Sequence, residues 1–302
     1  MIQNIVDALR QYVPQENISL QETMAGHTTF RVGGPADCFV KIENENQLIA
    51  VLTWLKQREI PYYVLGSGSN LLVSDAGFRG VILQIADKMN RIEVIGEEII
   101  ADAGVTMSRV ARTAWEHGLE GLEFASGIPG TIGGGVTMNA GAYGGEMCQV
   151  VAAVRVVDDK GQVLEIPVDE MAFGYRTSVI KSNPYVVTSV RFKLQAGDKD
   201  QIKARMDDFA ARRRDKQPLE YPSAGSTFKR PEGHFAGKLI MDAGLAGMQI
   251  GGAQVSEKHC GFVINTGDAT SADVRTLIGQ VQEKVKGQFG VDLEPEVIYL
   301  GE

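Results

Sequence analysis

A serine in the last third of the chain lies in a setting that suits proton donation. Ser226 belongs to the segment SAGSTFKRPEGHFAGKLI, in which Lys229, Arg230 and Lys238 follow it closely. The sequence has no GxSxG motif and no histidine placed to complete a triad, so a nucleophilic serine is not expected. A hydroxyl that donates a proton to a bound molecule is the functional interpretation. A hydroxyl that caps a turn or helix is the structural alternative.

Two carboxylates stand near the C-terminus in the segment LEPEV. Glu294 and Glu296 are separated by one proline on strand-like sequence. One of them could enter a site while the other meets solvent, and two exposed carboxylates are the alternative. The four histidines are dispersed and no two are four residues apart, so no metal site is expected.

Glycine, at 35 of 302 residues, is concentrated in two segments. In VLGSGSNLLV, Gly66 and Gly68 follow an expected strand, but Leu71 stands where a Rossmann fingerprint has its third glycine. The second segment is GIPGTIGGGVTMNAGAYGG. Glycine permits positive φ and close backbone approach, so such loops can cradle phosphates. Two loops suit a dinucleotide, and FAD is long enough to touch both. For the first loop, an ordinary tight turn after a buried strand is the alternative.

Hydrophobic spacing predicts the elements that position these residues. We expect helices at about residues 2–13, 45–58, 107–117 and 271–288, and an Arg-rich polar helix from about residue 200 that ends before Pro218. Strands are expected at residues 37–42, in PYYVLG and in EVIYLG. Between residues 71 and 194 the pattern predicts short strands interrupted by one clear helix. The cations of the polar helix alternate with Asp, which favours a solvated face over a polyanion site.

Composition limits the classes of function. The chain is 44% hydrophobic and 23% charged, with a formal net charge of -8, so it is expected to be globular and to repel nucleic acid. No apolar run is long enough to span a bilayer, and the first residues lack the pattern of a signal peptide. We therefore expect a cytoplasmic protein without membrane insertion, and the sequence gives no oligomeric state.

Taken together, the motifs resemble the UDP-N-acetylenolpyruvoylglucosamine reductase family of bacterial peptidoglycan synthesis. They run in order along nearly the whole chain: TTFRVGGPAD, VLGSGSNLLVSD, SGIPGTIGGGVTMNAGAYG, FGYRTS, AGSTFKRP and LEPEVIYLG. The resemblance implies an α+β fold with an FAD-binding domain of the vanillyl-alcohol oxidase type at residues 1–195. Within it we expect a βαβ subdomain at about residues 1–70 and a mixed α+β subdomain at about 71–195. A separate α+β substrate-binding domain is expected at 196–302, with its C-terminal strand returning to the active site.

The resemblance also implies the catalytic residues, which are Arg176 of FGYRTS, Ser226 of AGSTFK and Glu296 of PEV. In the family, NADPH reduces the flavin, which then passes hydride to the enolpyruvyl double bond while the serine protonates the neighbouring carbon. An arginine can stabilise the negative charge that develops beside the substrate carboxylate. Ser226 then acts as a general acid.

Binding residues follow in the same way. The implied FAD contacts are Arg31, Leu65, Gly66, Ser67, Gly68, Ser69, Asn70, Ser126, Gly127, Pro129, Gly130, Ile132, Gly133, Gly134, Asn139 and Gly141. The implied substrate contacts are Tyr175, Lys216, Lys229, Arg230 and His259. The tyrosine-bearing insertion of the longer class is absent, so the chain resembles the shorter class. Two rival hypotheses are an oxygen-using sugar or alcohol oxidase of the same fold and a non-catalytic binder of sugar nucleotides.

Overall fold

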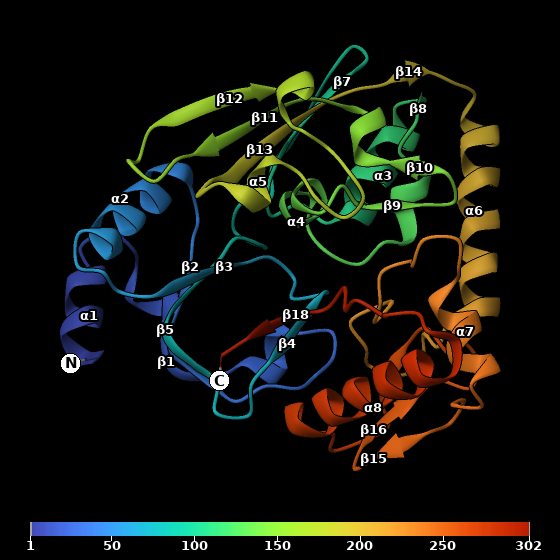
Figure 1. Cartoon of the computed structure of the whole chain (residues 1–302). Coiled ribbons are helices and arrows are strands. Elements are labelled where there is room, and N and C mark those ends of the chain that lie inside the picture. The colour runs from blue at the N-terminus through green and yellow to red at the C-terminus, as the bar shows by residue number, and fades with distance from the viewer. Residues whose placement is uncertain (1, 302) are drawn as a thin grey trace. The chain divides into compact units, whose positions relative to one another are not determined.

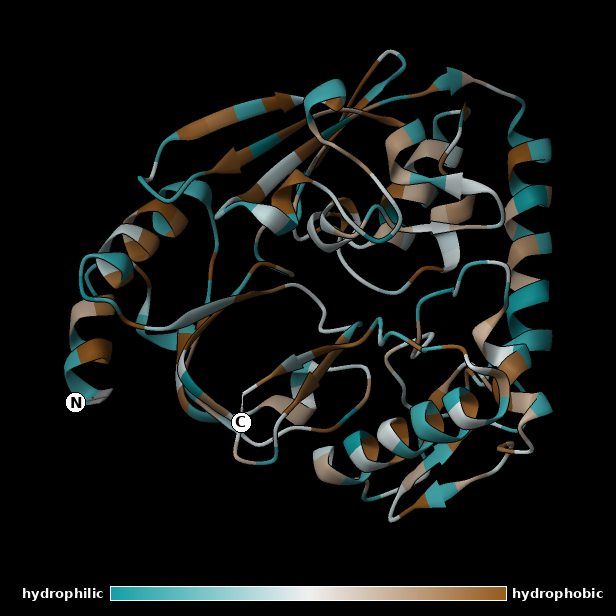
Figure 2. Cartoon of the chain, viewed as in Figure 1, coloured by the Kyte–Doolittle hydropathy of each residue, from teal (hydrophilic) through white to brown (hydrophobic). Residues whose placement is uncertain are grey.

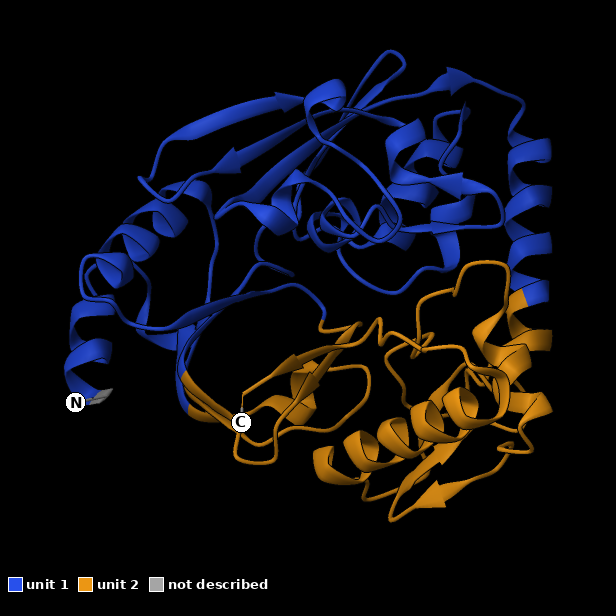
Figure 3. Ribbon diagram, viewed as in Figure 1, with its two compact units in different colours: residues 1–20, 38–67, 80–212 blue, residues 21–37, 68–79, 213–302 orange. Residues whose placement is uncertain are grey.

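The computed structural model describes residues 2–301 (Figure 1). The chain forms two compact units, each assembled from segments that are discontinuous in sequence (Figure 3). Unit 1 comprises the chain up to residue 20, residues 38–67 and residues 80–212. Unit 2 comprises residues 21–37, residues 68–79 and the chain from residue 213 onward. None of the helices within residues 2–301 combines the length and the apolar character needed to cross a bilayer.

Unit 1 contains a four-stranded sheet in the order β1-β2-β5-β3. Its strands are β1 (Ile18–Thr23), β2 (Pro35–Lys41), β3 (Tyr62–Leu65) and β5 (Phe78–Gln84), and three of them run across the unit boundary. The expected βαβ unit is present as β2, α2 (Glu45–Lys56) and β3, but β5 lies between the two strands and pairs with β3 in parallel. α2 begins at Asn44, whose side chain accepts a hydrogen bond from the Gln47 amide, and it buries an apolar face.

The second sheet of unit 1 is five-stranded and antiparallel, in the order β12-β11-β13-β7-β6. Its strands are β6 (Ile92–Ile95), β7 (Glu98–Asp102), β11 (Val151–Val157), β12 (Val163–Pro167) and β13 (Val186–Lys193). The other elements are α1 (Ile2–Leu9), η1 (Gln15–Asn17), α3 (Met107–Glu116), β8 (Leu119–Glu120), η3 (Glu123–Gly127), α4 (Ile132–Thr137), β9 (Gly141–Ala142), β10 (Gly145–Glu146), η4 (Met147–Gln149), η5 (Val168–Glu170), α5 (Val179–Ser182), β14 (Gln195–Ala196) and α6 (Lys199–Lys216).

The prediction that a single helix interrupts residues 71–194 was wrong. Besides α3, the structure contains α4 and α5. Three consecutive glycines lower the helix propensity of α4 and hide it from a search by periodicity. Thr131 caps this helix, and its residues Ile132 and Val136 are fully buried in the same core as the sheet residue Val190. Packing therefore overrides propensity at α4.

Unit 2 is built around α8 (Ser271–Phe289), which buries five apolar residues along one face. The helix has a Thr270–Asp273 capping box and ends at Gly290, whose φ is 70°. The other elements are η2 (Met24–His27), β4 (Leu71–Val73), α7 (Ala236–Asp242), β15 (Gln249–Ile250), β16 (Ala253–Val255), β17 (Val263–Asn265) and β18 (Ile298–Leu300). β15, β16 and β17 form one sheet, and β18 pairs with β4 in parallel.

The segments at residues 21–37 and 68–79 belong to unit 2 because of their packing. Phe30 and Leu72 are buried in one cluster with Val281 of α8. The Asp75 carboxylate accepts hydrogen bonds from the Ser271 and Ala272 amides at 2.8 and 3.0 Å, where it complements the positive end of α8. The compact units thus differ from the continuous segments 1–195 and 196–302, and the functional assignment of those two domains stays a prediction.

Candidate active site

The two glycine-rich loops meet within unit 1. A side chain at Gly66 would place its Cβ 2.5 Å from Oγ1 of Thr131, so only glycine fits against that threonine. Thr131 is buried and accepts a hydrogen bond from the Gly134 amide at the start of α4. The end of β3 therefore lies against the cap of the glycine-rich helix. A ligand that touches both loops requires this adjacency. Close packing against Thr131 is, however, enough by itself to explain why residue 66 is a glycine.

The three glycines of α4 have different surroundings. A Cβ at Gly133 would lie 3.0 Å from the Ala103 Cβ, and one at Gly135 would lie 2.8 Å from the Met107 sulfur. At Gly134, which is exposed, the nearest atom would be Oγ1 of Thr131 at 3.7 Å. Only the Gly134 position is thus open on the protein side, as a backbone surface for a ligand would be.

Many amides of the second loop are already used by the protein. The Ile132 amide donates to the Val105 carbonyl and the Gly133 amide to the Ala103 carbonyl, at 2.8 and 3.0 Å. These two amides therefore shape the loop. Residues 122–125 are buried, whereas residues 126–130 are half-buried or exposed. Ser126, Gly127, Pro129 and Gly130 thus lie where a ligand can reach the chain.

Asn139 is 3% exposed and its side chain is occupied by protein partners. Its amide nitrogen donates to Oε2 of Glu146 at 3.0 Å and to the Gly174 carbonyl at 3.1 Å, and its oxygen accepts from the Cys148 amide at 3.0 Å. Gly141 lies in the hairpin that Glu146 closes. Asn139 therefore ties the glycine-rich segment to the FGYRTS turn.

That turn carries Arg176. Gly174 and Thr177 exchange two backbone hydrogen bonds around Tyr175 and Arg176, and Arg176 has a φ of 55°. The Ser178 hydroxyl donates to the Thr137 carbonyl at the end of α4, at 3.0 Å. Tyr175 is 53% exposed, and the Arg176 guanidinium carbon lies 5.1 Å from its ring centroid. Unit 1 thus gathers Gly66, the second glycine-rich loop and the arginine turn.

Ser226 lies in unit 2 and is exposed, whereas its neighbour Thr227 is buried and holds the segment. The Thr227 amide donates to the Gly261 carbonyl at 2.8 Å, and its hydroxyl oxygen accepts from the Val263 amide at 2.9 Å. Gly225 on the other side has a φ of 75°. The serine hydroxyl is therefore accessible on a fixed backbone, which suits a proton donor.

Glu296, the expected catalytic glutamate, lies on the segment that pairs with this serine segment. The Glu296 amide donates to the Thr227 carbonyl at 2.8 Å, and Phe228 pairs with Pro295 in antiparallel register. Glu296 is half-buried, whereas Glu294 is 69% exposed on its side chain and forms an ion pair with Lys229. The two carboxylates thus have distinct surroundings, and Lys229, an expected substrate contact, has a carboxylate partner.

The histidine expected to bind substrate belongs to the same part of unit 2. The Gly261 amide donates to Nδ1 of His259 at 3.1 Å, so a neutral ring carries its proton on Nε2. Burial lowers the pKa of His259 from its ordinary value, which favours that neutral form. His259 can therefore offer a single N–H donor. Of the other expected contacts in unit 2, Lys216 and Arg31 are exposed, and the guanidinium carbon of Arg230 lies 3.9 Å from the Phe235 ring centroid.

The structure separates the expected catalytic residues by unit. Arg176 belongs to unit 1, and Ser226 and Glu296 belong to unit 2. The loop GSGSN is itself divided, because Leu65, Gly66 and Ser67 belong to unit 1 while Gly68, Ser69 and Asn70 belong to unit 2.

Sequence reasoning missed Thr131 and Thr227, which position the loops. A threonine before the buried Ile132 is a capping signal that could have identified the first, whereas nothing local marks the second. Among residues 2–301, no three potential metal ligands are grouped together.

Comparisons with known proteins place these features in a family. Residues 36–167 match the FAD binding domain family, and residues 217–300 match the C-terminal domain of UDP-N-acetylenolpyruvoylglucosamine reductase. The chain is 49% identical to the UDP-N-acetylenolpyruvoylglucosamine reductase of Clostridium kluyveri over 97% of this chain and 96% of that protein. It is 48% identical to the reductase of Caldanaerobacter subterraneus over the full length of both.

Solved structures agree with this placement. The crystal structure of the reductase (MurB) from Thermus caldophilus matches with a TM-score of 0.81 and 36% identity, covering 94% of this chain and 98% of that one. A Phl p 4 variant, a glucose oxidase, matches at a TM-score of 0.50 and 12% identity over 65% of this chain and 44% of that one, which shows fold alone. The expected α+β fold with an FAD-binding domain of the vanillyl-alcohol oxidase type is confirmed.

Proposed function

Because the chain belongs to the UDP-N-acetylenolpyruvoylglucosamine reductase family, whose FAD-binding domain it carries, we propose that it reduces UDP-N-acetylenolpyruvoylglucosamine to UDP-N-acetylmuramate. NADPH is the reductant and FAD the bound cofactor. The observation that carries the proposal is the match to these reductases along nearly the whole chain. When bound, FAD supplies the redox chemistry by accepting hydride from NADPH and delivering it to the enolpyruvyl double bond.

The free space around Gly134 and the partial exposure of residues 126–130 are compatible with FAD binding along this loop. Gly66 and Thr131 bring the first loop against the second, and Ser126 to Gly130 with Gly134 would hold the cofactor. Asn139, Ile132 and Gly133 support that surface through their protein hydrogen bonds. We assign them to shaping the cofactor site.

Ser226 supplies the proton that completes the reduction. Hydride addition to the terminal carbon of the enolpyruvyl group leaves an electron pair on the carbon that carries the carboxylate. The Ser226 hydroxyl donates its proton to that carbon, and the serine regains a proton from solvent. Its exposure and its fixed backbone favour this role over that of a cap.

Arg176 and Glu296 complete the catalytic group. The guanidinium of Arg176, on a tight turn fixed to the glycine-rich segment, stabilises the charge that develops on the substrate carboxylate. Glu296 acts in the half-reaction that reoxidises the flavin. The proposed contacts to the sugar nucleotide are Tyr175, Lys216, Lys229, Arg230 and His259. His259 acts there as a neutral Nε2–H donor.

The product is a precursor of peptidoglycan, so the proposed activity supports cell-wall biogenesis and, through it, cell shape and cell division. Nucleotide-activated sugars and NADPH are cytoplasmic metabolites, and we propose a cytoplasmic location without nucleic-acid partners. The chemistry of the site needs no metal.

An anaerobic two-step flavin titration tests the proposal. The purified protein should be yellow, lose its visible flavin absorbance on addition of NADPH, and regain it on addition of the enolpyruvyl sugar nucleotide. An oxidase of the same fold would be reoxidised by oxygen and ignore the sugar nucleotide. A protein without flavin absorbance that still binds the sugar nucleotide would be a simple binder.

A further inference from the structure

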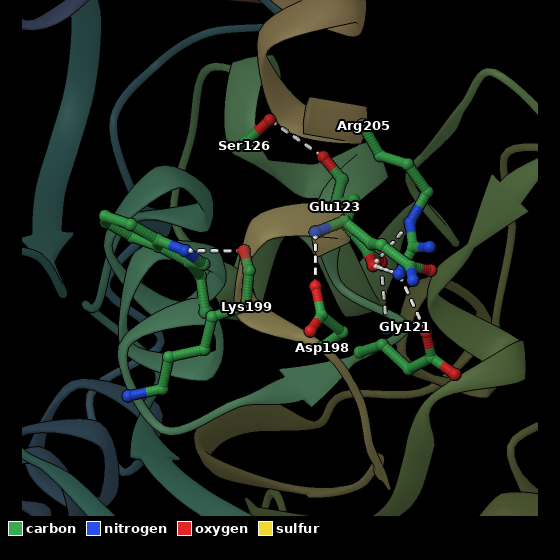
Figure 4. A network of polar contacts seen from close by, with 9 residues as sticks. Gly121, Glu123, Ser126, Asp198, Lys199 and Arg205 are labelled. Carbon is green, nitrogen blue, oxygen red and sulfur yellow. Dashed lines mark hydrogen bonds and ion pairs between the residues drawn. The ribbon is translucent and has the colours of Figure 1, made fainter. Parts of the chain in front are cut away.

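A buried carboxylate lies directly before the expected flavin-binding residues of the second loop. Glu123 is the first residue of η3, and its side chain is 9% exposed. Its Oε1 accepts from Nε and Nη2 of Arg205 at 3.0 and 2.6 Å, and its Oε2 accepts from the Gly121 amide at 2.8 Å. Figure 4 shows these contacts converging on Glu123. The carboxylate is thus held by charge-assisted bonds on both oxygens.

The same residue is bonded to the loop that follows. The Ser126 hydroxyl donates to the Glu123 backbone carbonyl at 2.8 Å (Figure 4). Phe124 and Ala125 between them are buried, so the turn has an apolar inner side and an ion pair at its start. Any shift of Glu123 is therefore passed to Ser126, where the reachable part of the loop begins.

Arg205 comes from α6, a helix along which hydrophilic residues recur (Figure 2). Its guanidinium also contacts Glu120 at 2.7 Å, and the hydrogen bond to Glu123 raises the pKa of Arg205. One turn further along α6, Phe209 stacks on Tyr143 with ring centroids 4.7 Å apart and planes 8° apart. Arg205 and Phe209 lie on one face of the helix and contact the two ends of the glycine-rich segment.

Tyr143 sits at the tip of the β9–β10 hairpin with a φ of 54°, a conformation that costs energy for a residue other than glycine. Its stacking on Phe209 offsets part of that cost. The helix α6 therefore fixes η3 through a partly buried ion pair and the hairpin through an aromatic pair. The residues between them are the expected FAD contacts.

We propose that Glu123 and Arg205 form a positioning pair for the flavin-binding loop. The pair holds η3 in the conformation that presents residues 126–130 to the cofactor, and the stack of Phe209 on Tyr143 fixes the other end of the segment. Neither residue of the ion pair touches a reacting atom. This inference rests on the proposed function for the identity of the ligand alone.

The test compares FAD binding by the apoprotein with local exchange of the loop. Glu123→Gln removes the charge and frees the turn. If the loop then has its FAD-binding conformation in one molecule out of ten, the apparent Kd for FAD rises about tenfold. Amide hydrogen exchange at residues 121–128 of the apoprotein should also accelerate, at least as strongly as the Kd rises, because the turn is then open most of the time. Arg205→Gln should match Glu123→Gln, and the double variant should be no worse than either. Arg205→Lys keeps the positive charge but loses the two parallel N–H donors of the guanidinium, so its Kd for FAD should lie between those of wild type and Arg205→Gln.

A matched control lies in the same unit. Glu45 of α2 accepts from Nε and Nη2 of Arg155 at 2.8 and 2.9 Å and from the Thr188 hydroxyl at 2.9 Å. Glu45→Gln removes a comparable pair outside the glycine-rich segment and should leave the Kd for FAD unchanged. A Kd unchanged by Glu123→Gln, or raised equally by Glu45→Gln, overturns the proposal. Should Glu123→Gln fail to fold, Arg205→Lys decides by the same two readouts.

The two proposals fail separately. A wild-type chain that binds no FAD removes the proposed function, and unaltered exchange at residues 121–128 in Glu123→Gln then also removes the positioning pair. If the wild-type chain binds FAD and Glu123→Gln binds it with the same Kd, only the positioning role of the pair is refuted.

Discussion

The side-chain amide of Asn70 donates a hydrogen bond to the backbone carbonyl of Glu296, with 3.0 Å between nitrogen and oxygen. The Ile298 amide donates in turn to the Asn70 carbonyl at 3.0 Å, and the parallel pairing of β4 with β18 begins at the next residues. The last residue of the GSGSN loop therefore fixes the backbone of the expected catalytic glutamate. A residue assigned to the cofactor from sequence also has a part in placing Glu296.

Asn70→Leu should weaken this connection. The substitution keeps the approximate shape but removes the donor, so the free energy of unfolding is expected to fall by about 1 kcal/mol. The rate at which substrate reoxidises the reduced flavin should fall as well, because Glu296 is less well held. Urea unfolding and stopped-flow absorbance at saturating FAD measure the two effects. Asn183→Leu is the control, since the exposed Asn183 amide also donates to a carbonyl, that of Val179, at 3.0 Å. Equal effects of both substitutions would refute the assignment.

The neighbouring carboxylates should respond differently to neutralisation. Glu294→Gln removes only a surface ion pair with Lys229, so its cost is expected to be about 0–1 kcal/mol with turnover nearly unchanged. Glu296→Gln should slow flavin reoxidation by about 100-fold or more if its carboxylate takes part in proton transfer. Single-turnover rates of both variants provide the measurement. Comparable losses in the two would show that the roles are wrongly divided.

Gly134→Val distinguishes a cofactor surface from a packed glycine. The position has open space on the protein side, so the apoprotein should fold with a melting temperature near that of wild type while FAD content falls sharply. Gly104→Ala is the counterpart, because its Cβ would lie 2.1 Å from the backbone carbonyl oxygen of Ala86 and should destabilise the fold itself. Flavin-to-protein ratios and thermal unfolding of the apoproteins are the readouts. Full flavin occupancy in Gly134→Val is incompatible with the assignment.

His259 should stay neutral near neutral pH. Burial lowers its folded-state pKa below the ordinary 6.5, so the unfolded chain takes up this proton more readily. The stability that the neutral ring contributes is complete above pH 6.5 and is lost as pH falls through the lowered folded pKa. His259→Gln should therefore flatten the fall in unfolding free energy between neutral and mildly acidic pH. An NMR titration of the His259 ring that gives a pKa above 6.5 would contradict this.

Much of the fold could be predicted because its elements carry local signals. α2, α3 and α8 each begin at a side chain that caps the helix, Asn44, Thr106 and Thr270, and each has apolar residues at helical spacing. α4 could not be found in this way, because glycine removes both propensity and periodicity. The hydrophilic face of α6 gave no sign of its contacts, since Glu123 lies 82 residues from Arg205.

The site depended on long-range pairing. Nothing local indicates that Thr227 lies beside Glu296, because their backbone bond joins segments far apart in the sequence. The expectation of a basic setting around Ser226 overlooked Glu294, which pairs with Lys229. Resemblance to a family supplied the expected catalytic residues, and the structure shows the bonds that hold their backbones.

Flavin absorbance of Ser226→Ala, followed through both half-reactions, shows whether Ser226 donates a proton within a flavin reductase. We predict normal FAD binding, near-normal reduction by NADPH, and reoxidation by the enolpyruvyl substrate slowed about 100- to 10,000-fold. Ser226→Cys, which keeps a proton donor, should recover part of that rate. Reoxidation of Ser226→Ala at the wild-type rate would show that Ser226 is not the proton donor.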